Sequence, residues 1–316
     1  MEIRNVLVPV DFSPASQFAV DFAVSLARRF RARLTLLHVV ESVAAFSYTF
    51  PLESDKPGEQ HTDQALDRLS KMLSPEDQDD LELQVRLRYG STEAEIRSAI
   101  DDEAASIVVI GTHHHGLIRR LLAGSVTEDL LREVPVPVLT VSSDAQPGTL
   151  ARILFATDLT EPSQEGFRFA LDLARTVGAH LEVLHVIEPI PLTYGGAVAS
   201  IDTHEDKQLL TEHARKMLAA LESEGSRHGV VVASELAEGI ASEQILEAAK
   251  NSAAELIVLT IHHKGLIERA LLGTTAERVV RDTRVPVLSF PVHPKAHRID
   301  SNEQHRPSLP DPSAMP

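Results

Sequence analysis

The sequence contains no cysteine. This absence excludes disulfide bonds, thiolate catalysis and cysteine-ligated zinc sites. No apolar run approaches the roughly 18 residues that a membrane-spanning helix needs, so we expect no membrane span. The opening residues, MEIRNVLVPVD, contain too short an apolar run for a signal peptide and lack its small-residue cleavage pattern. These features together predict a cytoplasmic location.

Basic residues are scarce relative to acidic ones. The chain has 30 Lys and Arg against 46 Asp and Glu, for a formal net charge of −16. An acidic balance of this size opposes binding to nucleic-acid phosphates and to anionic lipids, so we expect neither as a partner. A length of 316 residues favours two domains, since one domain usually takes roughly 150 residues.

Several catalytic motifs are also missing. The sequence has no G-x4-G-K-[ST] loop, no G-x-G-x-x-G fingerprint and no G-x-S-x-G elbow. No pair of carboxylates is spaced in a way that suggests hydrolysis. We therefore assign no catalytic residue from the sequence.

The strongest positive signal is an internal repeat. The segment NVLVPVDFSPAS matches RILFATDLTEPS, and IVVIGTHHHGLIRRLLAGSVTE matches LIVLTIHHKGLIERALLGTTAE. A repeat of this length predicts two similar domains rather than a short-period solenoid. We place the first domain at residues 1–143, a linker at 144–150 and the second domain at 151–292. Residues 293–316 are polar and proline-rich, which predicts a disordered tail.

Each copy alternates short apolar runs with longer amphipathic segments. The runs are nearly unbroken Val, Leu and Ile, as expected for strands that are buried on both faces. The order predicts an α/β fold with two tandem, doubly wound, five-stranded and mostly parallel sheets, related by a pseudo-two-fold axis. In the first copy the predicted strands are Val6–Val10, Leu34–Val40, Leu83–Leu87, Ile107–Ile110 and Val136–Val141.

Polar and glycine residues follow the first and fourth predicted strands, where such sheets bind ligands. Asp11 comes directly after the first strand, and Gly111 ends the fourth. Gly124 and Ser125 then open a helix, and Ser125 with Glu128 has the spacing of a capping box. Because a helix amino terminus favours anions, this arrangement predicts a phosphorylated ligand whose hydroxyls reach Asp11.

These residues resemble the universal stress protein family. Its ATP-binding members carry G-x2-G-x9-G-[ST] after the fourth strand, an Asp after the first strand and a His-Val near the end of the second. Here Gly111, Gly124-Ser125, Asp11 and His38-Val39 fit that pattern, whereas His114 replaces the second glycine. The likeness covers both halves and implies an adenine-nucleotide α-hydrolase-like fold.

The resemblance implies a site for ATP or ADP, with or without Mg²⁺, in the first domain. Asp11 would contact the ribose, and the backbone of Val10 and Val39 would flank the adenine. The phosphates would lie against Gly111, Gly124, Ser125, Val126 and Thr127, with His114 standing where the family has glycine.

The second copy departs further from the pattern. It keeps Asp158, Val186 and Gly273-Thr274, but Thr260 replaces the first glycine and His263 the second. We expect this copy to bind nucleotide weakly or not at all, to be structural, or to hold a different ligand. Thr274 with Glu277 again has capping-box spacing, which predicts a helix start there.

Structural roles compete with these functional ones. Asp11 is of a type that commonly caps a turn, and His38 and His185 fit satisfied core histidines. The histidine cluster at 113–115 and 262–263 raises the alternative of zinc, although three consecutive side chains cannot all point one way.

The fifth predicted strands, Val136–Val141 and Val285–Phe290, would be exposed apolar edges if left alone. Domains of this family commonly pair through these strands, so we expect intramolecular pairing about the pseudo-two-fold axis. A homodimer of two such chains is compatible with the sequence. The resemblance implies a stress-response regulator; the alternatives are a nucleotide-free interaction scaffold and a slow ATPase that would use Asp11 or Glu128.

Overall fold

The structure is a computed structural model of the whole chain. It describes residues 3–41, 59–112, 125–142, 149–189, 191–194, 197–200, 204–262 and 273–292. Residues 293–316, for which the sequence predicts disorder, lie outside these ranges. In the described ranges, no helix combines the length and the apolarity that crossing a bilayer requires.

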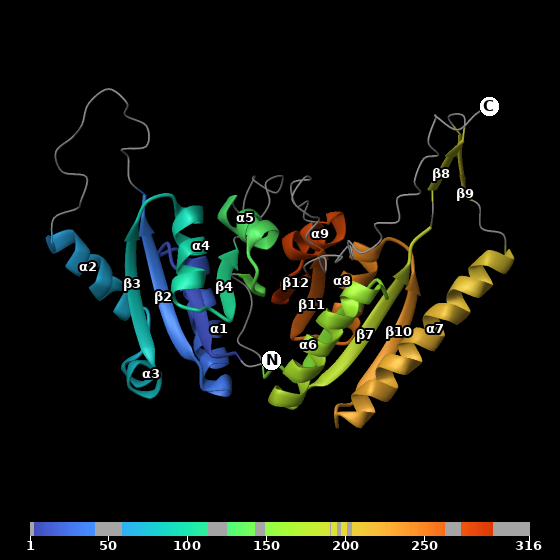
Figure 1. The fold of residues 1–316 in the computed structure, drawn as a ribbon, viewed down its shortest axis with the longest axis horizontal. Helices are drawn as coiled ribbons and strands as arrows, with labels where there is room; N and C mark the ends of the chain where they lie inside the picture. Colours follow the sequence, from blue (N-terminus) through green and yellow to red (C-terminus); the bar gives the residue numbers. More distant parts are fainter. Residues whose placement is uncertain are drawn as a thin grey trace, which may run out of the picture.

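The first domain alternates strands and helices in the predicted order (Figure 1). Its strands are β1 (Asn5–Pro9), β2 (Arg33–Val40), β3 (Leu83–Tyr89), β4 (Ile107–Thr112) and β5 (Val138–Ser142). Its helices are α1 (Pro14–Phe30), α2 (Glu59–Ser70), α3 (Pro75–Asp80), α4 (Thr92–Asp102) and α5 (Ser125–Glu133).

The second domain has the same order of main strands, with one helix, α7 (His204–Arg227), where the first domain has α2 and α3, and it adds a small two-stranded hairpin, β8 (Pro191–Tyr194) with β9 (Ala197–Ser200). Its main strands are β6 (Arg152–Thr157), β7 (His180–Ile187), β10 (Val232–Glu238), β11 (Leu256–His262) and β12 (Val287–Val292). Its other helices are α6 (Glu161–Val177), α8 (Ala241–Asn251) and α9 (Thr274–Asp282).

All ten main strands form one sheet in the order β10-β7-β6-β11-β12-β5-β4-β1-β2-β3. Within each domain the paired strands run parallel. The first strand of each domain lies between the second and the fourth, so the crossovers leave it in opposite directions. This confirms the doubly wound prediction and places a switch point between β1 and β4 and another between β6 and β11.

The two domains meet through their fifth strands, as predicted. β5 and β12 run antiparallel, with Leu139 opposite Leu288. These leucines occupy the same position of the repeat and are 1% and 2% exposed. The hydroxyl of Thr140 donates across the junction to the carbonyl oxygen of Val287 at 3.2 Å. The pseudo-two-fold axis therefore passes between Leu139 and Leu288, and both apolar edges are covered.

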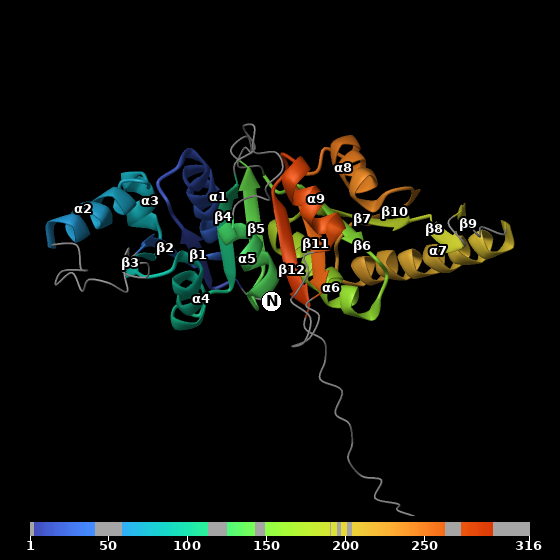
Figure 2. The same ribbon diagram turned by 90° about the horizontal axis from the view of Figure 1, so that it is seen from above.

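Apolar side chains on the two faces of the sheet form two core layers, each shared by both domains. One layer packs against α1 and α6, and the other against α4, α5, α8 and α9. Figure 2 shows helices on both sides of the sheet. The alternation of strand side chains explains this: Val6 and Val8 belong to the first layer, and Leu7 belongs to the second.

The first helices of the two domains, α1 and α6, have hydroxyl residues at their amino-terminal caps and left-handed residues at their carboxyl-terminal caps. Ser13 caps α1, its hydroxyl accepting from the Ser16 N–H at 3.2 Å, and Pro14 is the first helical residue. The equivalent cap in α6 is Thr160. At the carboxyl ends, Arg31 adopts the left-handed conformation with φ 52°, where the second domain has Gly178 with φ 73°.

Some predicted boundaries were wrong. β5 begins at Val138 rather than Val136, because Pro137 has no N–H to donate to the ladder. The spacing of Thr92 and Glu95 fits a capping box, but Ser91 holds the cap position of α4, and the Thr92 hydroxyl donates to Glu41 at 2.8 Å. Spacing alone did not identify the cap.

The outer strand β10 carries Glu235 beside Glu182 of β7. Burial raises the pKa of Glu235, and the nearby charges of Glu182 and Glu247 raise it further. Because this pKa is higher in the folded state than in the unfolded state, protonation of Glu235 stabilises the fold. The contribution to stability is complete at a pH below the unfolded pKa. That contribution is lost as the pH rises through the folded pKa.

We therefore expect Glu235→Gln to raise the free energy of unfolding at pH 7 by a few tenths of a kcal/mol, since exposed charges are strongly screened. The difference from wild type should vanish below about pH 4, where the unfolded carboxyl is also protonated. Urea unfolding at pH 7 and at pH 4 measures it. A stability gain for Glu235→Gln that is larger at pH 4 than at pH 7 would contradict the raised pKa of Glu235.

Candidate functional site

The two switch points place the same kinds of residue at the carboxyl edge of the sheet. In the first domain Asp11 follows β1, Val39 lies near the end of β2, and Gly111 lies in β4. The helix α5 begins at Ser125 after β4. His114 and Gly124, which the sequence also placed here, lie outside the described residues.

The carboxylates of Asp11 and Asp158 hold the turns that follow the first strands. Oδ1 of Asp11 accepts from the Ser13 N–H at 2.9 Å, and Oδ1 of Asp158 accepts from the Thr160 N–H at 3.0 Å. The residue after each aspartate is left-handed, with φ 63° at Phe12 and 59° at Leu159. The turn-capping role is thus confirmed, and both aspartates remain exposed at the edge.

His38 and His185 tie the second strands to the first. Their Nδ1 atoms lie 2.7 Å from the Val10 carbonyl oxygen and 2.8 Å from the Thr157 carbonyl oxygen. Because a carbonyl only accepts, Nδ1 carries the proton, and Nε2 of the neutral ring is an acceptor. Both rings are hydrogen-bonded as predicted, but half-buried rather than in the core. The His38 ring packs on Phe12 with centroids 4.5 Å apart.

Gly111 has a packing role that the motif does not reveal. A Cβ atom at this position would lie 2.1 Å from the carbonyl oxygen of Ala15 and 2.8 Å from the nitrogen of Ser16, both backbone atoms of α1. Only glycine lets the start of α1 lie this close to β4. Gly111 therefore brings the Asp11 turn against the fourth strand.

In the second domain the glycine at this helix–strand contact lies on the helix instead of on the strand. Thr260 stands in β11 where the first domain has Gly111, and Gly166 stands in α6 where the first domain has Ala19. A Cβ at Gly166 would lie 2.4 Å from Oγ1 of Thr260. That Oγ1 atom is buried and has no hydrogen-bond partner in the described part of the chain. The close approach of helix and strand is thus kept by a different glycine.

This exchange predicts a compensating pair. Gly166→Ala should lower the free energy of unfolding by about 1–3 kcal/mol through overpacking. Adding Thr260→Ala should restore most of the loss, because it removes the clashing hydroxyl together with its unsatisfied buried oxygen. A double-mutant cycle in urea measures the coupling. Additive losses would contradict the proposed contact.

The starts of α5 and α9 differ from the predicted capping boxes. Ser125 is the first residue of α5, and its hydroxyl donates to Oε1 of Glu93 in α4 at 3.4 Å. Gly273 rather than Thr274 caps α9, with φ −56° and no side-chain hydrogen bond. Glycine has no side chain that could accept from the N–H groups at the start of α9.

A cavity of about 390 Å³ lies at the switch point of the second domain. This volume is within the usual range for small-ligand sites. It brings together three of the four predicted second-copy residues, Asp158, Val186 and Gly273; Thr274 is not among its lining residues. The polar lining also includes Thr157, Glu188 and Thr275, which the sequence did not single out. It is completed by Thr260, which replaces the first glycine of the motif, and by His185, which the sequence assigned to the core.

Glu188 was the residue of this cavity that the repeat could have identified. Its carboxylate accepts from the Ala241 N–H at 2.7 Å and so caps α8. Glu41 stands at the same position of the first repeat and accepts from Thr92 at the start of α4. The recurrence of HVVE and HVIE marks this acidic rim in both domains.

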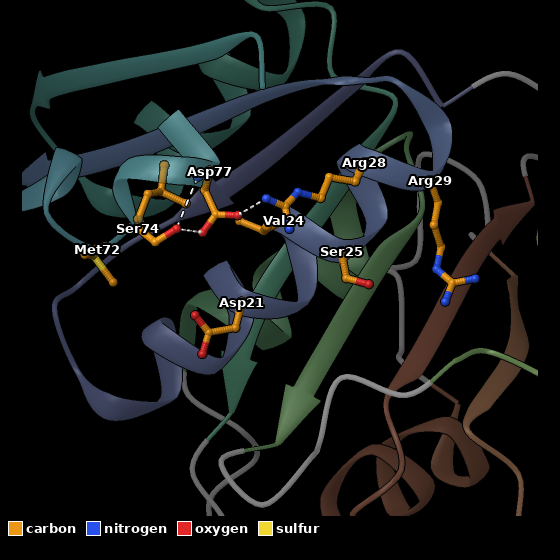
Figure 3. A pocket seen from close by; sticks show the side chains of 9 residues that line it. Asp21, Val24, Ser25, Arg28, Arg29, Met72, Ser74 and Asp77 are labelled. Carbon is orange, nitrogen blue, oxygen red and sulfur yellow. Dashed lines mark hydrogen bonds and ion pairs between the residues drawn. The ribbon is translucent and has the colours of Figure 1, made fainter. Parts of the chain in front are cut away.

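A second hollow, of about 610 Å³, lies between α1 and α3, away from the switch points (Figure 3). In this hollow Arg28 lies 2.9 Å from Asp77, and the Asp21 carboxylate accepts from Gln17 at 2.9 Å. Ser74 caps α3 by accepting from the Asp77 N–H at 3.1 Å. These contacts serve the packing of α3 on α1, so we place the candidate site at the switch points.

Metal binding gains no support from the described ranges. Within them, no group of three or more His, Asp or Glu side chains could hold a metal ion. The histidines at 113–115 and 263 lie outside these ranges, so the zinc alternative is untested.

Comparisons with known proteins agree with this tandem fold. Residues 2–142 and 149–291 match the Universal stress protein family. The chain is 28% identical over 296 residues to a universal stress protein of Mycolicibacterium smegmatis, covering 90% of this chain and 96% of that one. It is 30% identical over 137 residues to universal stress protein MJ0531 of Methanocaldococcus jannaschii, covering 43% of this chain and 79% of that protein.

Among solved structures, a universal stress protein from Archaeoglobus fulgidus aligns with a TM-score of 0.68 at 20% identity, covering 92% of this chain and 97% of that one. The fold and the repeated switch-point architecture define a tandem α/β protein. The chain belongs to the universal stress protein family, with two family domains in tandem. One universal stress protein was solved in complex with cAMP, and another, from Archaeoglobus fulgidus, with dAMP.

Proposed function

We propose that the first domain binds ATP or ADP at its carboxyl edge and that the chain acts as a stress-response regulator rather than an enzyme. The bound nucleotide would change the surface that the first domain presents to partners. Ordering of a loop by phosphate groups is an established switching device.

One observation carries this proposal. The second domain encloses a cavity of about 390 Å³ at its switch point, between the turn of Asp158 and the start of α9. The first domain has the same strand order, the same aspartate turn and a helix start in the same place. The pseudo-two-fold relation therefore supports a crevice of similar size between Asp11 and Ser125.

Each residue has a separate role in the proposed site. The exposed carboxylate of Asp11 would accept from the ribose hydroxyls, and the backbone of Val10 and Val39 would flank the adenine. Gly111 keeps the Asp11 turn close to β4. The phosphates, with or without Mg²⁺, would bind at the start of α5, where Ser125, Val126 and Thr127 lie. Gly124 precedes these residues, and His114 belongs to the same connection. Thr127 is 2% exposed, so it would contribute its backbone.

The acids near this site support binding over catalysis. Glu128 forms an ion pair with Arg132, and Asp11 is held by its turn. A general base must reach the proton that it removes, and both carboxylates already have other partners. A turnover assay comparing Asp11→Ala with wild type distinguishes the slow ATPase alternative.

Isothermal titration calorimetry with ATP and with ADP tests the proposal. We expect binding to wild type, and about 10–100-fold weaker binding to Asp11→Ala, because a hydrogen bond to a charged group contributes about 1.5–3 kcal/mol. Asp11→Asn keeps an acceptor for the Ser13 N–H and separates loss of charge from loss of the turn. Asp21→Ala, on the exposed face of α1, is the matched control. Absence of heat at millimolar nucleotide would favour the interaction scaffold.

A further inference from the structure

The start of α5 lies beside a carboxylate from a neighbouring helix. Glu93 is in the first turn of α4, and its Oε1 accepts from the Ser125 hydroxyl at 3.4 Å. Its Oε2 accepts from the Ser91 hydroxyl at 3.2 Å. These two contacts hold the Glu93 carboxylate at the amino terminus of α5, where the positive end of the helix dipole lies.

The charge of Glu93 also acts on the next residues of α5. Burial raises the pKa of Asp129, and the negative charges of Glu133 and Glu93 raise it further, whereas Arg97 lowers it. Arg97 pairs with Asp129 at 3.6 Å and with Glu133. The Arg97 guanidinium is therefore committed to two carboxylates of α5.

The second domain lacks this carboxylate. Ser242 occupies the position of Glu93 in the repeat, and it is 3% exposed. The start of α9 is capped by Gly273, which lines the cavity. The two domains thus differ by one negative charge at the helix start that faces the switch point.

We propose that Glu93 is a specificity-determining residue of the first domain, acting as an intramolecular anion at the start of α5. The inference rests on the proposed nucleotide function. A phosphate chain placed at this terminus meets both the favourable helix dipole and the opposing Glu93 carboxylate. The repulsion grows with the charge of the ligand, so Glu93 biases the site against the most highly phosphorylated nucleotide.

Titration of adenosine, AMP, ADP and ATP against wild type and Glu93→Ser tests this inference. Serine is the residue that the second domain carries at this position. We expect ATP to bind about 10-fold more tightly to Glu93→Ser, with smaller gains for ADP and AMP and less than about a twofold change for adenosine. The gain should shrink at high salt, since the interaction is between charges near the surface.

Two further variants separate charge at this position from other effects. Glu93→Gln keeps an oxygen that can accept from Ser125, so it should reproduce the gain if charge is the cause. Glu76→Ser removes one negative charge from the exposed helix α3 and should change every affinity by less than about twofold. Thermal unfolding followed by circular dichroism verifies that each variant folds.

The outcomes distinguish the inference from the proposed function. If wild type binds ATP and neither Glu93 variant raises the ratio of ATP to adenosine affinity, the inference is overturned and the proposed function stands. If no nucleotide binds to wild type or to either variant, the proposed function and the inference both fall. If nucleotide binds only to the Glu93 variants, the inference is supported and binding by wild type is overturned.

Discussion

Replacement of Gly111 by alanine is expected to lower the free energy of unfolding by about 3 kcal/mol or more. Overpacking of a core by one methyl group usually costs about 1–3 kcal/mol, and here the new Cβ would meet backbone that cannot rotate away. It would lie 2.1 Å from the carbonyl oxygen of Ala15 and 2.3 Å from its carbonyl carbon. The variant can fold only if α1 moves off β4, and that movement disrupts the core layer between them.

Gly273→Ala is the matched control for this experiment. Within the described ranges no atom lies within 4 Å of the Cβ that it would add, and the backbone φ of −56° suits any residue. Its cost should stay below about 1 kcal/mol, the preference for glycine over alanine at a cap. Urea unfolding followed by circular dichroism measures both variants. Equal stability of Gly111→Ala and wild type would show that α1 and β4 are farther apart than the structure places them.

The second large effect is expected at the junction of the two domains. Leu139→Ala and Leu288→Ala should each cost about 2–5 kcal/mol, as truncation of a fully buried leucine does. The two leucines face each other across the pseudo-two-fold axis, so their costs should agree within about 1 kcal/mol. Val231→Ala is the control, because Val231 is 63% exposed and should change stability by less than about 0.5 kcal/mol.

The double variant Leu139→Ala/Leu288→Ala tests the contact itself. Residues in contact give non-additive changes, so the cost of the pair should differ from the sum of the single costs by more than about 0.5 kcal/mol. Urea unfolding provides all four corners of this cycle. Additive costs, or a leucine whose truncation is neutral, would contradict the antiparallel junction of β5 and β12.

The repeat made most of the fold predictable. Because both copies carry the same alternation of apolar runs and amphipathic segments, the strand order and both switch points followed from general rules of α/β sheets. The junction followed from the fifth strands, since two apolar edges are stabilised by covering each other. The two-stranded hairpin β8–β9 has no counterpart in the first domain, so the repeat did not indicate it.

The parts of the site that depend on tertiary contacts could not be predicted from the sequence. Glu93 and Ser125 are 32 residues apart, and only the packing of α4 beside α5 brings them together. The packing role of Gly111 depends on the direction in which its Cβ would point, which a motif does not encode. Capping-box spacing was misleading at Thr274 because Gly273 takes the cap.

The exchange of Gly111 for Thr260 also changes how the motif is interpreted. The motif associates Gly111 with phosphate contact, yet a side chain at this position would collide with the backbone of α1. Gly166 meets the same packing need in the second domain from the helix side. Loss of that strand glycine therefore does not by itself indicate a lost site, and the cavity of about 390 Å³ in the second domain agrees with this.

A crystal structure of the chain grown with excess ADP tests the central claim most directly. The account predicts one nucleotide at the carboxyl edge of the first domain, its ribose hydroxyls within hydrogen-bonding distance of the Asp11 carboxylate and its phosphates at the start of α5. A first-domain edge that holds only water at saturating ADP would contradict the account, and so would nucleotide bound solely between α1 and α3.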